Sequence, residues 1–197
     1  MEIINNQVLV VRTKFPSRIT ETIKKSKVVQ KKGDVSEVAV NWGLKEAQIL
    51  RTLNLKNVPS PIVRDYPWPG AFPPMAHQKD TASFLTLHKR AFCFNEQGTG
   101  KTAAAIWAAD YLMNQGIVKR VLVVCPLSIM QSAWQADLFK TAMHRTCAIA
   151  HGSRRKKVIE GGYEFVIINY DGMTPERDTI KRSEEHTSEL QSPYVIS

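Results

Sequence analysis

Residues 95–102, NEQGTGKT, are of types that can hold the phosphates of a nucleotide. Glycine permits the backbone dihedrals that turn several N–H groups toward one anion. The Lys101 ammonium can neutralise the β- and γ-phosphates of ATP, and the Thr102 hydroxyl can coordinate Mg²⁺. These two residues are the candidates for catalysis. The predicted ATP-binding residues of the loop are Gly98, Thr99, Gly100, Lys101 and Thr102.

One position departs from the general pattern G-x-x-x-x-G-K-[ST], because Asn95 occupies the place of the first glycine. The alternative interpretation is a chance GTGKT on a surface turn. A genuine phosphate loop follows a strand and opens a helix. Residues 90–95 (RAFCFN) predict the strand, and residues 101–116 predict the helix, which Gly116 is placed to end. These flanking elements favour the phosphate loop.

Strands and helices alternate on both sides of this loop. Helices are predicted at 76–89 and 128–142, with Ser128 and Gln131 as a capping box at the start of the second. Strands are predicted at 118–126, 146–152 and 163–171. The first of these three is almost wholly apolar, which is typical of a sheet covered on both faces. The alternation predicts an α/β fold with a mostly parallel sheet.

Residues 1–60 follow a different pattern. Strand composition occurs at 7–13 and 36–42, and a short amphipathic helix is predicted at 44–53. The proline-rich residues 57–75 exclude a regular helix or central strand, and the domain boundary is placed there. The predicted organisation is a small mixed segment at 1–60 followed by a nucleotide-binding lobe at 61–181.

The chain has 197 residues and a formal net charge of +9. This balance favours an anionic partner such as nucleic acid, although ordinary solubilising lysines are the alternative. No apolar run is long enough to cross a bilayer, and no signal peptide is recognised, so no membrane partner is predicted. Cys93, Cys125 and Cys147 lack metal-ligand spacing and are expected to be buried free thiols in a reducing compartment.

An ordered series of segments resembles the Swi/Snf-type ATPases of the superfamily-two helicases. That family carries an acidic residue followed by E-M-G-x-G-K-T, and NEQGTGKT differs from it at Asn95 and Gln97. PMAHQ (74–78) resembles the glutamine motif, and VLVVCPLSIMQSAW (121–134) resembles motif Ia. AIAHGSRRKK (148–157) and VIINYDGM (166–173) resemble the next two strands with their loops. The resemblance covers residues 74–173 and implies a RecA-like fold; the opening segment resembles that of bacteriophage-encoded members.

This resemblance implies roles for individual residues. Gln78 would pair with adenine, and Trp68 or Phe72 would stack on the base, core packing being the alternative for both aromatics. The residues implied to contact the DNA backbone are Pro126, Leu127, Ser128, Gly152, Arg154, Asn169 and Tyr170. Helix capping is the alternative for Ser128, and a solvated helix face is the alternative for the RRKK segment (154–157). His77 and His151 are expected to pack or to make local hydrogen bonds.

The family also carries a magnesium carboxylate in a D-E-x-x motif at the end of an apolar strand. The sequence SEEH (183–186) is rejected for this role because the residues before it, RDTIKR, contain only one large apolar side chain. Residues 182–192, RSEEHTSELQS, resemble the in-frame translation of a synthetic sequencing adapter. Residues 182–197 are therefore expected to lie outside the fold, with the natural sequence ending near Lys181 before the carboxylate.

The resulting hypothesis is a fragment of an ATP-dependent DNA helicase or translocase, with ATP and Mg²⁺ as cofactors. The whole protein would hydrolyse ATP, while the fragment would bind ATP and DNA without useful turnover. The predicted location is cytoplasmic, in a bacterial host if the protein is phage-encoded. The alternatives are another phosphate-loop enzyme, such as a small kinase, and a non-hydrolysing nucleotide- or DNA-binding module.

Overall fold

The structure is a computed structural model that describes residues 1–185 and 194–196, and side chains up to Ser183. The chain forms two compact units. The first unit contains Met1–Tyr66 and Ser83–Phe92, and the second contains Pro67–Ala82 and Cys93–Ser197. Helix α4 (Ala76–Leu87) contributes its first part to the second unit and its last part to the first.

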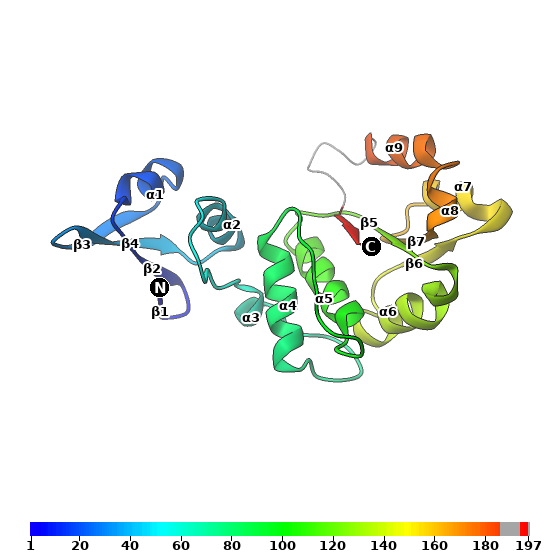
Figure 1. Ribbon diagram of the computed structural model, residues 1–197, viewed down its shortest axis with the longest axis horizontal. Coiled ribbons are helices and arrows are strands. Elements are labelled where there is room, and N and C mark those ends of the chain that lie inside the picture. The colour runs from blue at the N-terminus through cyan, green and yellow to red at the C-terminus, as the bar shows by residue number, and fades with distance from the viewer. Residues whose placement is uncertain (186–193, 197) are drawn as a thin grey trace. The chain divides into compact units, whose positions relative to one another are not determined.

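The first unit is built on a four-stranded antiparallel sheet of order β1-β2-β4-β3 (Figure 1). Its elements are β1 (Glu2–Ile4), β2 (Val8–Thr13), α1 (Pro16–Thr22), β3 (Lys27–Lys32), β4 (Val35–Asn41), α2 (Leu44–Thr52) and α3 (Ile62–Asp65). The predicted strands and the predicted short helix correspond to β2, β4 and α2. Strand β4 alternates: Ser36, Val38 and Val40 are buried, whereas the residues between them are half-buried and Asn41 at its end is exposed.

Four elements of the first unit lie where the sequence pattern predicts none: β1, α1, β3 and α3. Helix α3 lies within the proline-rich residues 57–75, which were expected to exclude a regular helix; it is a single short turn that begins after Pro61 and ends before Pro67. Helix α1 begins at Pro16, which occupies the first turn, where its missing N–H costs nothing. Strand β3 is exposed along its whole length and is an edge strand. Its lysines, Lys27, Lys31 and Lys32, are typical of edge strands that resist pairing with another chain.

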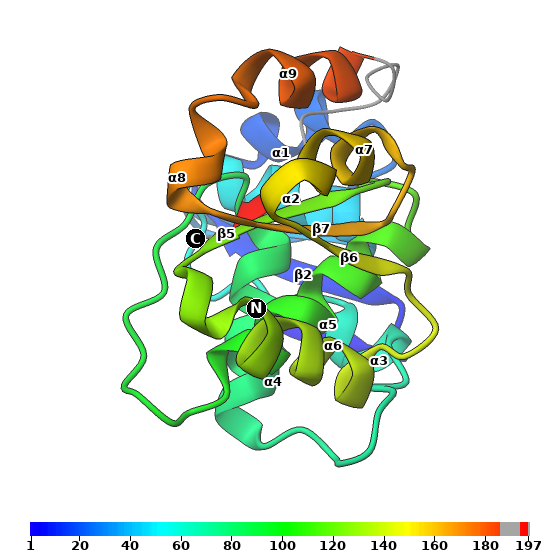
Figure 2. The same ribbon diagram turned by 90° about the vertical axis from the view of Figure 1, so that its right-hand side faces the viewer.

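The second unit contains a parallel sheet of order β6-β7-β5-β8. Its elements after α4 are α5 (Lys101–Asn114), β5 (Val121–Cys125), α6 (Ala136–Thr141), β6 (Cys147–Ala150), α7 (Arg155–Glu160), β7 (Phe165–Asn169), α8 (Tyr170–Met173), α9 (Arg177–Glu185) and β8 (Tyr194–Ile196). Figure 2 shows α7 on one face of this sheet and α5 and α6 on the other. The predicted α/β fold with a doubly covered parallel sheet is confirmed.

The core of the second unit follows from this arrangement. All five residues of β5 and of β7 are buried, as expected for central parallel strands. On one face, Leu122, Val124, Val166 and Ile168 pack with Ile159 of α7, together with Ala150 and Ile180. Helix α5 is buried from Ala103 to Leu112 and supplies Ile106 and Trp107 as fully buried side chains.

Two local predictions in the second unit are wrong. Residues 91–96 form no strand, although a strand was predicted at 90–95. A strand exists only when a neighbour pairs with its backbone, and no sheet pairing includes these residues. The predicted helix at 128–142 is broken into a 3₁₀ turn (Leu127–Ile129), a π-helical turn (Met130–Gln135) and α6, and no side chain caps its start. The predicted capping box of Ser128 is therefore absent from this described segment.

The tail contains two described elements. Residues 182–185 continue α9, and β8 pairs in parallel with β5, Leu122 lying opposite Val195. This pairing satisfies a row of backbone groups along the edge of β5, for which a β-prone sequence such as YVI is suited. That residues 182–197 lie outside the fold stays a prediction, which deletion of the tail tests. The remaining tail residues lie outside the described part.

Candidate nucleotide and nucleic-acid site

The loop between α4 and α5 has the backbone that its glycines permit. Gly98 and Gly100 have φ of +77° and +71°, in the left-handed region that other residues seldom adopt. The Lys101 ammonium donates to the backbone carbonyls of Asn95 at 2.9 Å and of Glu96 at 2.7 Å. The loop thus curves around the Lys101 side chain, with the ammonium at its centre.

Helix α5 begins directly at Lys101 with no side-chain cap. The first N–H groups of a helix have no partner within the helix, and together with the helix dipole they favour an anion. A Cβ built on Gly98 would meet nothing within 4 Å, so space remains beside the loop backbone. These three features fit the phosphates of a nucleotide, with Lys101 as the cation and Thr102 as the available hydroxyl.

Two side chains of helix α4 hold the loop through the backbone carbonyl of Thr99. The Gln78 side chain is 6% exposed; its Oε1 accepts from Met75 N at 2.9 Å, and its Nε2 donates to Thr99 O at 3.3 Å. His77 Nε2 also contacts Thr99 O, at 3.0 Å, which is the local hydrogen bond expected for this histidine. Gln78 therefore holds the loop in this structure, and pairing with adenine would replace one of these two bonds.

Asn95 explains the departure from the general loop pattern. Its side-chain Nδ2 donates to Thr81 Oγ1 at 2.8 Å, and Thr81 Oγ1 donates to His77 O at 2.8 Å. A glycine at this position has no side chain to make this bond. Asn95 thus ties the start of the loop to α4, a role that the sequence analysis did not assign. The contact spans 14 positions, so no local pattern indicates it.

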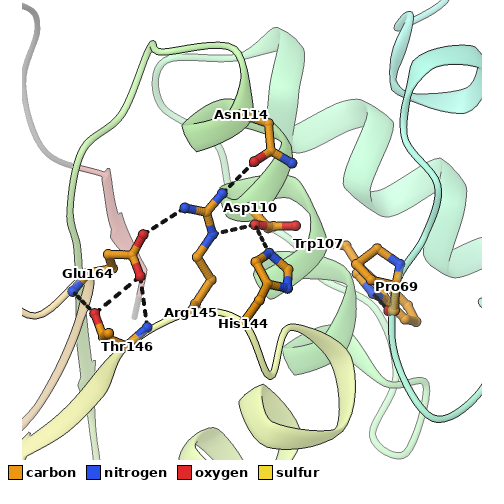
Figure 3. A network of polar contacts seen from close by, with 8 residues as sticks. All are labelled: Pro69, Trp107, Asp110, Asn114, His144, Arg145, Thr146 and Glu164. Carbon is orange, nitrogen blue, oxygen red and sulfur yellow. Dashed lines mark hydrogen bonds and ion pairs between the residues drawn. The ribbon is translucent and has the colours of Figure 1, made fainter.

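The two aromatic candidates for base stacking contact Trp107 in the second unit. Trp68 and Phe72 each lie edge-to-face against the buried Trp107, with ring centroids 5.8 Å apart. Trp107 Nε1 donates to Pro69 O at 2.9 Å and so fixes the linker on α5 (Figure 3). Trp68 is half-buried and Phe72 is 37% exposed, so both make a packing contact while base stacking by either one stays a prediction.

The predicted DNA-contacting residues gather at the carboxyl edge of the sheet. The strand register places Cys125 opposite Asn169 and Ala150 opposite Ile168, so the segments that follow β5, β6 and β7 begin at the same edge. The exposed residues of these segments include Pro126, Leu127, Ser128, Gly152, Arg154 and Tyr170. Asn169 differs from them because it is buried.

Arg155 differs from the rest of the RRKK segment because its side chain lies beside Gly172, as does that of Asn169. Arg155 is half-buried, whereas Arg154, Lys156 and Lys157 are exposed. A Cβ built on Gly172 would lie 2.9 Å from both Arg155 Nε and Asn169 Oδ1. Both atoms are buried without a hydrogen-bond partner in the described part of the chain. Arg155 is therefore part of the packing at the carboxyl edge, and only its three neighbours form a solvated cationic face.

A polar network at the opposite, amino edge of the sheet holds α5 against β6 and β7 (Figure 3). Arg145 donates to Asp110 at 2.5 Å, to Glu164 at 2.6 Å and to Asn114 at 2.5 Å. Burial raises the pKa of Glu164, but hydrogen bonds from Thr146 and Arg145 and the Arg145 charge outweigh it, so the pKa is lowered. The network lies away from the loop and the carboxyl edge and has a structural role.

The three cysteines are free thiols. Cys125 is buried as predicted, but Cys93 and Cys147 are only partly buried. Burial raises the pKa of Cys147 to about 11, so this thiol remains protonated at neutral pH.

The parallel sheet covered by helices on both faces is that of a partial RecA-like domain. The sequence model of the family described as "Type III restriction enzyme, res subunit" matches residues 71–197, and the chain belongs to this family. No curated protein sequence matches the chain.

Among solved structures, the chain is similar to one described as "Sulfolobus solfataricus SWI2/SNF2 ATPase core in complex with dsDNA", with 24% identity and a TM-score of 0.50. The match covers 56% of this chain and 24% of that one, so the chain spans about a quarter of that structure's length. The predicted resemblance to Swi/Snf-type ATPases is confirmed at the level of the fold. Neither finding bears on a bacteriophage origin. Within the described residues, no helix has the length and apolarity needed to cross a membrane.

Proposed function

We propose that this chain is part of an ATP-dependent DNA helicase or translocase of Swi/Snf type. In this proposal the loop at 95–102 binds ATP, and the carboxyl edge of the sheet contacts the DNA backbone. The observation that carries the proposal is the position of the Lys101 ammonium. It lies at the centre of a loop that precedes helix α5 and in which Gly98 and Gly100 adopt the left-handed backbone conformation. A chance GTGKT on a surface turn gives no reason for this arrangement.

The residues that would hold ATP are those of the loop. Lys101 would exchange its bonds to the Asn95 and Glu96 carbonyls for bonds to phosphate oxygens, and the N–H groups that begin α5 would donate to the same phosphates. The Thr102 hydroxyl would be one ligand of Mg²⁺, which neutralises phosphate charge when bound. Gln78 would keep the loop backbone in place through Thr99.

A binding measurement tests the nucleotide site. Titration of the 197-residue chain with a fluorescent ATP analogue should show saturable binding, and Lys101→Ala should weaken it at least tenfold. A hydrogen bond to a charged group contributes about 1.5–3 kcal/mol, and about 1.4 kcal/mol corresponds to a factor of ten. Lys119→Ala removes an exposed lysine of the same unit and is the matched control. Equal affinity of both variants would contradict the proposed site.

Turnover is expected to be absent. The sequence contains no Asp-Glu pair, and the segment SEE at 183–185 belongs to helix α9 rather than to the end of a core strand. The magnesium carboxylate of the family pattern therefore has no counterpart in this chain, and its absence deprives the site of one metal ligand. Steady, DNA-stimulated release of phosphate by the purified chain would contradict this part of the proposal.

The DNA contact is proposed for the exposed segments at the carboxyl edge. Backbone phosphates are bound by N–H groups, hydroxyls and cations, and the segments at 126–128 and 152–154 offer all three. Such contacts do not read the bases, so the proposed binding has no sequence preference. Tyr170, which is exposed at the same edge of the sheet, would lie beside the bound DNA strand.

A further inference from the structure

The first unit contains a concave site that no step of the proposed function uses. It has a volume of about 570 Å³ and lies where helix α2 ends and where the chain leaves helix α4. Five basic residues line it: Arg51, Lys56, His88, Lys89 and Arg90. The other lining residues are polar except for Leu87, and none is acidic. We call these lining residues the basic cavity.

Two of the basic residues build the wall of the basic cavity. Arg51 donates from Nε to His88 Nε2 at 2.9 Å and from NH1 to Leu55 O at 3.1 Å. His88 Nδ1 lies 2.7 Å from Phe84 O. Because a carbonyl only accepts and the arginine Nε only donates, His88 carries its proton on Nδ1 in this arrangement. These bonds hold the ends of α2 and α4 together.

The other three cations have no such role. Lys56, Lys89 and Arg90 are exposed, and none of them makes a hydrogen bond or an ion pair with any residue that the structure describes. Cations that only compensate a helix dipole lie within the last turn of the helix. Lys56 follows the end of α2 by four positions, and Arg90 follows the end of α4 by three. These three exposed cations therefore line one concavity, and its lining includes no acidic side chain.

The lining chemistry points to phosphate groups on a chain. Lysine, arginine, threonine, asparagine and glutamine side chains are the groups that contact nucleic-acid phosphates, and all five types line the basic cavity. No Phe, Tyr or Trp lines it, and the one aromatic ring in its lining, that of His88, already lies 4.2 Å from the Phe84 ring, so the lining favours the backbone over stacked bases. We infer that the basic cavity binds the phosphodiester backbone of a nucleic-acid strand as a second contact, separate from the carboxyl edge. The choice of DNA as the probe rests on the proposed function.

The test compares two variants that remove the same charge. Lys56→Gln/Lys89→Gln/Arg90→Gln removes three cations from the basic cavity. Lys24→Gln/Lys31→Gln/Lys32→Gln removes three exposed cations elsewhere in the first unit and is the control. The affinity of the full chain for a fluorescein-labelled 30-mer DNA duplex is measured by anisotropy over a range of salt concentrations, without nucleotide. Thermal melting of each variant checks that the fold is kept.

The cavity variant is expected to bind DNA about tenfold more weakly at low salt. Its slope of log affinity against log salt should be smaller by about 2–3, because each phosphate contact on duplex DNA contributes about 0.9 to that slope. The control should stay within about twofold of the parent. Equal losses in both variants would show a general charge effect and overturn the inference.

Two further outcomes separate this inference from its alternatives. In the first, unlabelled ATP is added to the DNA complexes of the parent chain and of the Lys101→Ala variant. If ATP displaces the DNA equally from both, the cavity binds free nucleotides, and the inference that its ligand is a polynucleotide is overturned. If the parent binds DNA and the cavity variant is unchanged, the inference fails while the proposed function stands. If the parent does not bind DNA at all, both fail.

Discussion

At the scale of single residues, two groups of charged side chains in the second unit differ in their surroundings. Lys101 and the exposed cations of residues 154–157 belong to the proposed ligand sites. Asp110, Arg145 and Glu164 satisfy one another at the amino edge of the sheet, with the Asp110 side chain 1% exposed. Charged pairs of the second kind are costly to break, because each partner is then left buried without compensation.

Glu164 provides a pH-dependent test of this network. Its lowered pKa means that the stability it contributes is present above about pH 4.5, its ordinary value, and is lost as the pH falls through the lower folded-state value. Glu164→Gln should reduce the free energy of unfolding by about 1–2 kcal/mol at pH 7, and this reduction should shrink as the pH falls below about 4.5. Urea unfolding at several pH values measures this. Glu160→Gln, at an exposed position, is the control. A loss of free energy of unfolding in Glu164→Gln that does not depend on pH would contradict the assigned role of the Glu164 carboxylate.

At the scale of elements, the linker at 67–72 is packed against helices rather than free. Gly70 has φ of +131°, and a Cβ added there would lie 2.5 Å from Lys140 O and 2.9 Å from Thr141 Cα. Ala71 N donates to the same Lys140 carbonyl at 2.7 Å. The linker therefore passes close to the end of α6, where only glycine fits.

Gly70→Ala is expected to destabilise the second unit by about 2 kcal/mol or more, since backbone strain of about 1–3 kcal/mol adds to the clash with α6. Gly162 is the matched control, because its φ is +75° but a Cβ there would meet nothing within 4 Å. Gly162→Ala should cost only the strain, about 1 kcal/mol. Thermal unfolding of the two variants compares them. Equal melting temperatures would show that the linker does not contact α6 as described.

Strand β8 allows a second test at this scale. Its pairing covers an edge of β5 that is otherwise open. Deleting residues 194–197 should lower the melting temperature by several degrees and increase aggregation, because an unpaired edge of a buried strand is a template for other chains. An unchanged melting temperature would instead favour the interpretation that the tail derives from an adapter sequence and lies outside the fold.

At the scale of the whole molecule, the net charge of +9 produces a long-range attraction for polyanions. This attraction depends on salt but not on sequence. The exposed cations Arg154, Lys156 and Lys157 begin at the carboxyl edge, where the proposed DNA contacts lie. Their contribution to DNA binding can be measured without changing Arg155, which packs near Asn169 and Gly172.

Replacing Arg154, Lys156 and Lys157 together by glutamine should flatten the salt dependence of DNA binding by about 2–3 in log–log slope. Binding without salt should remain independent of base sequence. Anisotropy titrations with two unrelated duplexes measure both quantities. An unchanged slope would show that these side chains are a solvated helix face and that the carboxyl edge binds no DNA through them.

The sequence alone determined those features of this protein that depend on local pattern. The candidate phosphate loop at 95–102 stood out because its glycines, lysine and threonine are close together and precede a predicted helix. The strands β5 and β7 and the helices α4 and α5 were predicted from local composition, which needs only neighbouring residues. The alternation of these elements then indicated the parallel sheet.

Only the tertiary structure decided the features that join distant parts of the chain. The bonds of Gln78 and Asn95 around the loop, the packing of Trp68 and Phe72 on Trp107, and the Arg145 network all connect residues many positions apart. The missing strand at 91–96 and the pairing of β8 with β5 depend on which backbone is available as a partner. Pairing and packing are properties of two segments at once, and a pattern within one segment does not contain them.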